Sequence, residues 1–471
     1  MDNHLDGGPG MSTSTITTAA RQELAGFSGE LVGREDAGYD EARKVYNAMI
    51  DRRPALIACC ATREDVAAVV GFAGERDMLL AVRGGGHNGG GLGVCEEGVV
   101  IDLSMMKQID VDAANRVVRV GGGCTWGEVD RATHEAGMAT PCGIVGTTGV
   151  GGLTLGGGIG HIARKHGLSI DSLLEAEMVL ADGSRVEASA DENPDLFWAI
   201  RGGGGNFGVV TSFLFRMHPV NMVQGGPTFW PLEESAEVLR AYGSFITAAP
   251  RELNGFFAFA TVPPVPAFPE ELHGRKVAGI VWCHTGTAEQ AAADMAPMLA
   301  VGNPLLHGVG EMPYPALQGF FDPLYPPGLQ WYWRADFVRE LSDEAIARHV
   351  EFGEKMPAGH STMHLYPIDG AVHDVASSDT AFSFRDVNFA EVIVGVDPDP
   401  ANADAITRWT VEYWDATHPY SAGGAYVNFM MDEGQERVKA TYGANYDRLT
   451  QVKAKYDPNN LFRVNQNIRP A

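Results

Sequence analysis

Residues 82–91 read VRGGGHNGGG and place one histidine, His87, among six glycines. Glycine loses more backbone freedom on folding than any other residue, so such a run is costly unless the backbone needs positive φ angles or must approach another group closely. A bound ligand is the usual reason for such an approach. The stretch therefore predicts a ligand-binding loop with His87 at its centre.

Three further glycine runs follow, at residues 121–123, at 146–160 (GTTGVGGLTLGGGIG) and at 201–208 (RGGGGNFG). Successive backbone N–H groups in conformations that glycine permits form concave sites for anions, and a pyrophosphate matches such sites in extent. The runs follow predicted strands that lie well apart in the sequence. We therefore expect one extended dinucleotide cofactor that touches several of these loops.

Two alternatives remain open for these glycines. A single run can be a mobile loop, and GGGIGH from Gly156 can be interpreted as a nicotinamide-type Rossmann fingerprint. That fingerprint needs an acidic residue about 20 positions later, at the end of a parallel strand. Glu175 and Glu177 lie near that distance, but residues 174–189 alternate across Asp182-Gly183, which favours an antiparallel hairpin.

Composition excludes several classes of partner. A chain of 471 residues is long enough for two domains, and its net charge of −25 repels nucleic acids and anionic membranes. The six cysteines lack zinc-type spacing, so we expect buried, reduced thiols and no metal site. No run of about 18 apolar residues predicts a membrane span, and the polar N-terminus lacks the apolar core of a secretory signal. We expect a cytoplasmic protein.

Hydrophobic patterning divides the chain into a first region of alternating strands and helices and a second α+β region with an antiparallel sheet. The Thr125–Glu128 spacing predicts a capped helix, and Asn193-Pro194 is expected to begin another. Residues 262–274 are expected to form an exposed loop, and residues 437–456 one long helix. The expected division is a disordered tail (1–20), a cofactor domain (21–220), a substrate domain (221–410) and a C-terminal segment that returns to the cofactor domain (411–471).

Four long segments together resemble one family. VRGGGHNGGG, GTTGVGGLTLGGGIG, NPDLFWAIRGGGGNFGVVT (193–211) and YDPNNLFRVNQNIRP (456–470) are similar to the berberine bridge enzyme-like flavoproteins of the vanillyl-alcohol oxidase superfamily, including bacterial members such as the flavoenzyme of the enterocin pathway. The likeness extends from about residue 42 to residue 470. It implies an α+β fold with a PCMH-type FAD-binding domain of two subdomains, and a substrate domain whose antiparallel sheet is flanked by helices.

The resemblance implies FAD bonded covalently through its 8α-methyl group to His87. Many family members have a second bond from a cysteine, but the corresponding position here is Val145, and Cys142 lies three residues earlier. We therefore expect a single histidyl linkage and an inert Cys142. The other residues expected at the cofactor are Arg83, Gly84, Gly85, Gly86, Asn88, Thr147, Thr148, Gly149, Gly152, Leu153, Gly156, Gly157, Gly158, Gly160, Ile162, Gly208, Val209, Val210 and Asn465.

The resemblance also implies an oxidase, in which hydride passes to flavin N5 and oxygen is reduced to H2O2. Thr148 aligns with a position beside the reactive flavin face, where a small side chain leaves room for oxygen. Tyr426 of GGAYVNFM (423–430) is the expected catalytic base, with Asn428 beside it on a strand. Further candidates are Tyr442 and Tyr446, four residues apart on a helix, and His364.

Alternatives to the oxidase are an oxygenase of the flavin N5-oxide type acting on a polyketide-like substrate, and a protein that binds FAD without catalysis. The candidate substrates are alcohols, sugars, phenols, amines and polyketides. The partners expected are a small molecule and molecular oxygen, with the chain acting as a monomer or a homodimer. Aromatic residues of the second region, among them Phe256, Phe257, Phe259, Tyr332 and Trp333, either line a substrate pocket or fill the core of the sheet.

Overall fold

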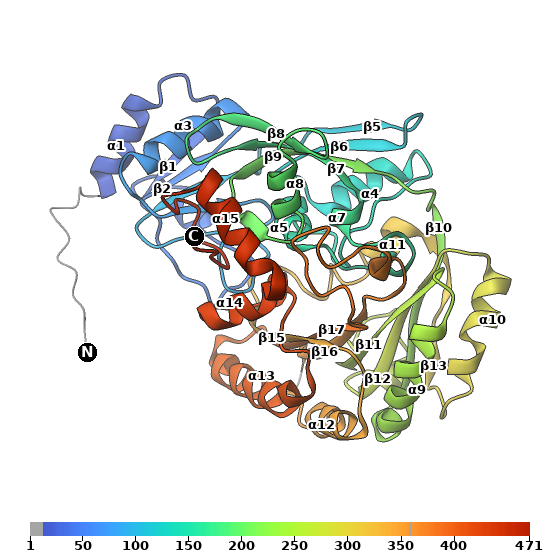
Figure 1. Cartoon of the computed structure of the whole chain (residues 1–471). Helices are drawn as coiled ribbons and strands as arrows, with labels where there is room; N and C mark the ends of the chain where they lie inside the picture. The colour runs from blue at the N-terminus through green and yellow to red at the C-terminus, as the bar shows by residue number, and fades with distance from the viewer. Residues whose placement is uncertain (1–12, 358) are drawn as a thin grey trace.

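The computed structural model describes residues 13–357 and 359–471. Their strands form three sheets, two in the first half of the chain and a larger one in the second (Figure 1). The expected α+β fold, with an antiparallel sheet flanked by helices in the second half of the chain, is confirmed. Within the described residues, no helix is both long and apolar enough to cross a bilayer.

The first sheet has the strand order β1-β2-β4-β3, in which β2, β4 and β3 run parallel and the edge strand β1 pairs antiparallel with β2. Its strand β3 ends at Arg83, directly before the first glycine run, as the sequence predicts. The elements of this subdomain are α1 (Thr13–Glu23), β1 (Glu30–Gly33), α2 (Tyr39–Ala42), β2 (Leu56–Cys59), α3 (Arg63–Gly74), β3 (Leu80–Arg83) and β4 (Val99–Asp102).

The second sheet is entirely antiparallel, in the order β5-β6-β9-β7-β8. The predicted hairpin across Asp182-Gly183 is confirmed, and Glu175 and Glu177 lie in it, so the Rossmann alternative is excluded. Its elements are β5 (Ile109–Asp112), β6 (Val117–Gly121), α4 (Trp126–His134), α5 (Val150–Gly156), α6 (Ala163–His166), α7 (Ser169–Ser172), β7 (Leu173–Val179), β8 (Arg185–Ser189), α8 (Pro194–Ile200) and β9 (Val209–Arg216).

The third sheet is antiparallel, in the order β13-β10-β12-β11-β16-β17-β15, and β14 pairs with β10. Helices α9, α12 and α13 cover its outer face, and the inner face looks toward the glycine loops (Figure 1). Its elements are β10 (Met222–Pro231), α9 (Ser235–Ala248), β11 (Leu253–Thr261), β12 (Lys276–His284), α10 (Ala288–Leu299), β13 (Leu306–His307), β14 (Gly310–Pro313), α11 (Tyr314–Gln318), β15 (Gln330–Val338), α12 (Asp343–Glu354), β16 (Thr362–Pro367), β17 (Phe389–Asp397) and α13 (Ala403–Thr417).

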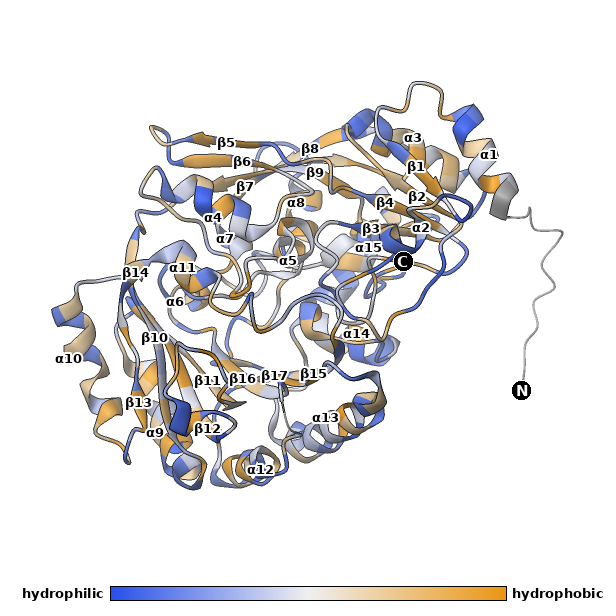
Figure 2. Cartoon of the chain, turned by 180° about the vertical axis from the view of Figure 1, so that it is seen from behind, coloured by the Kyte–Doolittle hydropathy of each residue, from blue (hydrophilic) through white to orange (hydrophobic). Residues whose placement is uncertain are grey.

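The strands of this sheet carry buried apolar residues on both faces, and Figure 2 colours each strand by the hydropathy of its residues. Phe257 and Phe259 point to the outer side, where they pack in a core with residues of α9, α12 and α13. Phe256, one position away, packs in the core on the inner side. The alternation of side chains along a strand thus gives each face its own core.

The C-terminal helices α14 (Gln435–Tyr442) and α15 (Tyr446–Tyr456) return to the first half of the chain, where α15 packs against α8 (Figure 1). Lys453 and Asp457 are fully buried there, with Nζ and Oδ2 2.7 Å apart, and Nζ also donates to the Asn206 carbonyl. This buried pair fixes the C-terminal segment to the glycine run at 201–208.

Several expectations need correction. Residues 13–20 belong to α1 and are ordered, because Ile16 and Ala20 are buried against the first sheet; residues 1–12 of the expected tail lie outside the described residues. The loop 262–274 is not simply exposed, since Val262, Phe268 and Leu272 are buried in a small core beside β10 and β12.

The C-terminal region differs as well. The expected long helix is broken at Gly443, whose φ of +49° ends α14. The expected boundary at residue 411 falls inside α13, which packs on β15 and β17 of the large sheet. Asn193 precedes α8 as expected, but its side chain donates to the Glu187 carbonyl and does not cap the helix.

Candidate active site

A cavity of about 350 Å³ lies between the glycine loops and the inner face of the large sheet. Residues of all four glycine runs contribute to one side of it. Strands β15, β16 and β17 and the segment from Tyr426 to Phe429 contribute to the other side. The tertiary fold therefore brings the predicted loops together around a single space.

His87 lies in the wall of this cavity, and the ring of Tyr46 stacks on its imidazole with the centroids 3.8 Å apart and the planes inclined by 20°. Thr147 Oγ1 is 2.9 Å from His87 Nε2, and Thr148 Oγ1 is 3.5 Å from Nδ1. Burial lowers the pKa of His87 to about 4. The imidazole is therefore neutral at physiological pH, which is its nucleophilic form.

Two neighbouring side chains hold the loop that carries His87. Arg83 is buried and forms an ion pair with Asp102 at 2.6 Å, and its guanidinium also donates to the carbonyls of Ala42 and Lys44. Asn47 donates to the carbonyls of Gly89 and Trp331, and its Oδ1 accepts from Trp331 N. These bonds join the first glycine run to β15, which lies across the cavity.

The first and third glycine runs touch through their backbones. A Cβ atom on Gly85 would lie 2.4 Å from the Gly149 nitrogen, so any larger residue would push the two loops apart. By contrast, a Cβ atom on Gly152 or Gly205 would meet no atom within 4 Å. Both of these glycines line the cavity, so their lack of side chains leaves room for a ligand against the backbone.

Most of the expected cofactor residues line the cavity: Arg83, Gly84, Gly85, Gly86, His87, Asn88, Thr148, Gly149, Gly152, Leu153, Gly208, Val210 and Asn465. The others do not line it: Thr147, Gly156, Gly157, Gly158, Gly160, Ile162 and Val209. Packing explains several of these. Gly160 makes room for the Cys142 carbonyl, Gly156 for the Asn428 amide, and Val209 points to the opposite face of β9 from Val210.

Tyr426 and Asn428 line the cavity, but not on a strand, because residues 427–429 form a short 3-10 turn in the segment after α13. The turn brings the two side chains together, and Asn428 Nδ2 donates to the Tyr426 hydroxyl at 2.7 Å. The backbone N–H of Gly158 donates to the same oxygen at 2.9 Å. Burial raises the pKa of Tyr426 to about 12, while these hydrogen bonds act to lower it.

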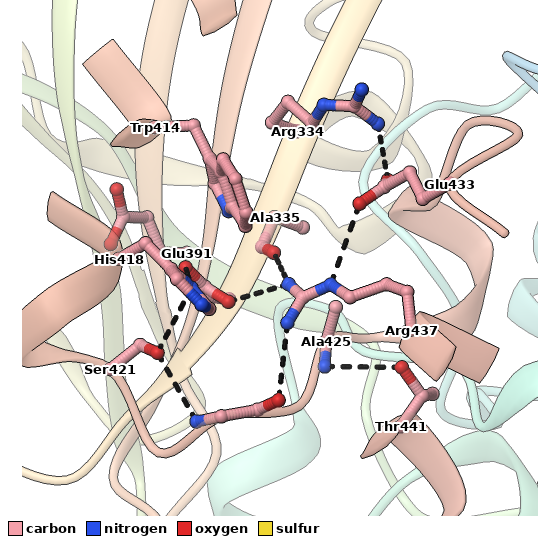
Figure 3. A network of polar contacts seen from close by, with 12 residues as sticks. Arg334, Ala335, Glu391, Trp414, His418, Ser421, Ala425, Glu433, Arg437 and Thr441 are labelled. Carbon is pink, nitrogen blue, oxygen red and sulfur yellow. Dashed lines mark hydrogen bonds and ion pairs between the residues drawn. The ribbon is translucent and has the colours of Figure 1, made fainter. Parts of the chain in front are cut away.

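A network of buried charges anchors this segment (Figure 3). Arg437 of α14 pairs with Asp336 of β15 and donates to the Gly423 carbonyl, while Arg334 Nη1 lies 3.0 Å from Glu433 Oε1. Glu433 in turn accepts the N–H of Met431, just after the 3-10 turn. The network therefore ties both ends of residues 423–433 to the edge strand β15 and positions Tyr426.

The inner face of β16 contributes Thr362, His364 and Tyr366 to the cavity wall. His364 Nδ1 and the Tyr366 hydroxyl are 2.6 Å apart. Burial lowers the pKa of His364 to about 3 and raises that of Tyr366, so both side chains are neutral at physiological pH. Tyr366 could have been predicted from the sequence, because it lies two residues after His364 on the same strand face.

Of the two tyrosines expected to share a helix face, only one borders the cavity. Tyr442 lines the cavity and donates from its hydroxyl to the Gly203 carbonyl, whereas Tyr446 is absent from the cavity wall in the described part of the chain. The break at Gly443 changes the helix direction between them, so the expected shared face does not exist. Their sequence spacing was therefore misleading.

The cysteines behave as expected. All six lie in the described residues and are free thiols, five of them buried. Cys142 Sγ lies 2.6 Å from Gln318 Nε2 and 3.6 Å from the Tyr314 hydroxyl, in a buried cluster with Asp130. Burial raises the pKa of this thiol well above its usual value. Val145, not Cys142, lines the cavity.

Comparison with known proteins identifies the family. Residues 54–189 match the FAD binding domain family, and residues 425–469 match the berberine and berberine-like family. An FAD-linked oxidoreductase of Dictyostelium discoideum is 33% identical over 91% of this chain and 91% of its own length. The chain belongs to the berberine bridge enzyme-like family of FAD-linked oxidoreductases. It is an FAD-dependent oxidoreductase.

Three further comparisons show which proteins this oxidoreductase is similar to. The (R)-6-hydroxynicotine oxidase of Paenarthrobacter nicotinovorans is 29% identical over 94% of this chain and 97% of its own length. The crystal structure of 6-hydroxy-D-nicotine oxidase from Arthrobacter nicotinovorans superposes with a TM-score of 0.84 and 25% identity, covering 94% of this chain and 98% of that one. A carbohydrate oxidase from Microdochium nivale, at 22% identity and a TM-score of 0.85, shares the fold.

The cavity of this FAD-linked oxidoreductase fits the cofactor. The open backbone at Gly152 and Gly205 leaves room for a ligand, and Asn465 adds a side-chain oxygen, Oδ1, that is buried without a protein hydrogen-bond partner. A buried acceptor without a donor is costly unless a ligand supplies one. The residues that would hold FAD are therefore those of the glycine loops, His87 and Asn465.

Sequence reasoning missed several residues of this site: Tyr46, Asn47, Phe321, Tyr325, Trp331 and Phe429. Tyr46 and Asn47 precede β2 in a segment with no glycine run or capping pattern, so no local signal marks them. Trp331 lies two residues before Trp333. Because alternate side chains of a strand point to the same face, Trp331 could have been predicted at the cavity once Trp333 was assigned to it.

Proposed function

We propose that the chain is an oxidase that holds FAD covalently, with a ring nitrogen of His87 bonded to the 8α carbon of the flavin. The support is geometric: the imidazole is neutral, is held in place by Tyr46 and Thr147, and lies where the first and third glycine runs meet. Val145 provides no thiol on the cavity wall, so His87 is the single attachment.

Tyr426 acts as the base that removes the substrate's hydroxyl or amine proton. Its oxygen accepts two hydrogen bonds, from Gly158 N–H and Asn428 Nδ2, and both are stronger when that oxygen is a phenolate. This pair of donors is the observation that carries the proposal, because it stabilises the ionised form that burial opposes. Bound FAD supplies the acceptor for the substrate hydride at N5.

The large sheet forms the substrate side of the site, and the glycine loops form the cofactor side. Thr148 lines the cavity between them, and its small side chain leaves space for oxygen. The net reaction takes two electrons and two protons from a substrate CH–OH or CH–NH group and passes them to O2, giving a carbonyl or imine and H2O2. His364 contacts the substrate from β16, and Tyr442 closes the cavity from α14.

The proposal is tested on the purified holoenzyme. After acid precipitation, yellow colour should stay with the polypeptide, and the mass of the denatured chain should exceed the sequence mass by one FAD. His87→Ala should abolish both while the chain still folds. H2O2 should form in proportion to the substrate oxidised. A colourless pellet from the wild type, with the mass of the bare polypeptide, would overturn the covalent attachment.

A further inference from the structure

On the substrate side of the cavity, aromatic rings form a closed series of mutual contacts, which we call the aromatic collar. Successive ring centroids lie between 5.0 and 6.5 Å apart around the whole series. In order of contact the collar consists of Phe321, Tyr325, Trp331, Trp333, Phe429, Tyr366 and Phe256, which returns to Phe321. All except Phe256 line the cavity.

The collar lies directly beside the proposed base. The ring of Tyr426 meets that of Phe429 edge-on, with the centroids 4.8 Å apart. A substrate held within the collar would therefore present its reacting carbon near the Tyr426 hydroxyl. Aromatic rings pack best against other flat rings, with edge-to-face and offset contacts at these same separations.

The cavity offers no free charge. Among the described residues in its wall, Arg83 alone carries a permanently charged side chain, and its guanidinium is occupied by Asp102 and two carbonyls. A carboxylate, a phosphate or an ammonium group of a substrate would be buried without a counter-ion. Such burial is strongly unfavourable unless the charge is paired.

The collar's hydroxyl groups and their neighbours are turned to the protein. Tyr325 donates to the His360 carbonyl, Tyr46 to the Tyr325 carbonyl, and Thr362 to the Phe259 carbonyl. A sugar has a hydroxyl on nearly every carbon, and each one buried here without a partner would cost free energy. Aromatic stacking on a sugar face does not compensate for several such losses.

Three polar groups remain on the sheet wall: the indole N–H groups of Trp331 and Trp333, which have no protein partner among the described residues, and the imidazole of His364. His364 lines the cavity, and its Nδ1 is engaged by the Tyr366 hydroxyl, which leaves Nε2 as the ring nitrogen available to a ligand. Because His364 is neutral, Nε2 forms a hydrogen bond to a neutral group and not an ion pair. The ring also packs against Phe256, with the centroids 4.9 Å apart.

We propose that the substrate is an uncharged, planar aromatic compound that packs within the aromatic collar. Besides the group being oxidised, this compound has one polar substituent, which binds His364 Nε2. Sugars, carboxylates and charged amines are rejected. This inference rests on the proposed oxidase function, because that function assigns the large sheet to the substrate.

The test uses the holoenzyme and a series of compounds that share one aromatic framework and differ in a single substituent. Naphthylmethanols that carry hydrogen, hydroxyl, carboxylate or trimethylammonium on the far ring are mixed anaerobically with the enzyme, alongside cellobiose, and flavin bleaching gives the limiting rate and the apparent Kd. The hydroxyl compound should give the highest ratio of rate to Kd. The two charged compounds and cellobiose should fall at least about 100-fold below it, given the cost of unpaired polar burial.

Variants of His364 test whether this residue makes the polar contact with the substrate. His364→Phe should remove the preference for the hydroxyl compound over the unsubstituted one, and His364→Gln should restore part of it. Tyr332→Phe, on the same strand as Trp333 but on the opposite face of the sheet, is the matched control and should leave the preference unchanged. Loss of the preference in the control, or its retention in His364→Phe, would overturn the role of His364.

The outcomes separate the two proposals. Faster bleaching by cellobiose or by a charged naphthyl compound overturns the substrate class and leaves the oxidase intact. If no compound bleaches the flavin, the oxidase is in doubt, and calorimetric titration with the corresponding naphthaldehydes still decides the class. Tighter binding of the uncharged aldehydes than of the charged ones supports the collar, and equal binding overturns it.

Discussion

The imidazole of His87 lies almost flat against the ring of Tyr46, with the two centroids 3.8 Å apart. Tyr46 is held in turn by its hydroxyl, which donates to the Tyr325 carbonyl, and by its backbone N–H, which donates to the Gly86 carbonyl. The histidine is thus oriented by a residue that lies 41 positions earlier in the chain (87 − 46) and belongs to no glycine run.

Removing this ring should impair flavin attachment. In Tyr46→Ala the imidazole loses the surface that fixes its plane, so the fraction of chains carrying covalent FAD should fall, while Tyr46→Phe keeps the stacking and should retain it. Intact mass after expression with excess riboflavin measures the fraction. Equal attachment in the alanine and phenylalanine variants would show that stacking does not position His87.

The Asn428 amide should set the pH dependence of catalysis. Asn428→Leu removes a donor from the Tyr426 hydroxyl, so the pKa of this phenol should rise and the pH profile of anaerobic flavin reduction should move to higher pH, by roughly one to two units for a hydrogen bond to a charged group. Gly156→Ala provides an independent variant. Its Cβ would lie 2.3 Å from Asn428 Oδ1 and should displace the amide, giving a shift in the same direction. A profile that stays in place or moves to lower pH would contradict this arrangement.

The charged network of Figure 3 should support both stability and turnover. Arg437→Met leaves the buried carboxylates of Asp336 and Glu433 without a major partner, and it should lower the free energy of unfolding by about 3–5 kcal/mol. Flavin reduction should slow because the segment carrying Tyr426 loses its anchor. Lys439→Met on the same helix is the control, because its pair with Glu436 is exposed. Equal free energies of unfolding in urea for the two variants would show that the network does not stabilise the fold.

Stability should fall as the pH drops below about 6.5. Burial lowers the pKa of five histidines, besides His87, which we propose is bonded to the flavin, to about 3 or 4, so between pH 6.5 and 4 the unfolded chain binds protons that the folded chain does not. Asp130 and Glu391 oppose this, because burial raises their pKa to about 7 and about 8, but they are two groups against five. The histidines are His161, His166, His218, His349 and His364.

Chemical denaturation at pH 7, 6 and 5 measures this dependence. His349→Gln removes one titrating group and should reduce the pH slope by about one proton. Constant stability over this range would show that these side chains are not neutral in the folded protein.

Cys142 should be dispensable for the flavin. Its sulfur lies in the buried cluster with Asp130, Tyr314 and Gln318 and does not line the cavity, so Cys142→Ala should leave the attached FAD and its absorption spectrum unchanged. The mass of the denatured variant, with one FAD retained, checks this. Covalent FAD that is retained in His87→Ala and lost only when Cys142 is replaced as well would point to a second bond.

Some features of this protein follow from local sequence. The glycine runs, the strand that ends at Arg83 and the hairpin at Asp182-Gly183 each depend on backbone preferences within a few residues, and the structure has them where the sequence predicts them. The long ordered motifs likewise indicated the family, which the comparisons confirm. His87 could be singled out for the same reason, because it is embedded in a run that needs a ligand.

Other features depend on contacts between distant residues. No periodic pattern in the sequence predicts three of them. These are the 3-10 turn that joins Tyr426 to Asn428, the break at Gly443 that separates Tyr442 from Tyr446, and the stacking of Tyr46 on His87. The aromatic collar combines rings from β11, β15, β16 and two connecting segments, and apolar side chains on those strands also suit a buried core. Only the packing of the sheet against the glycine loops decided which of them border the cavity, because burial is a property of the assembled faces and not of any single strand.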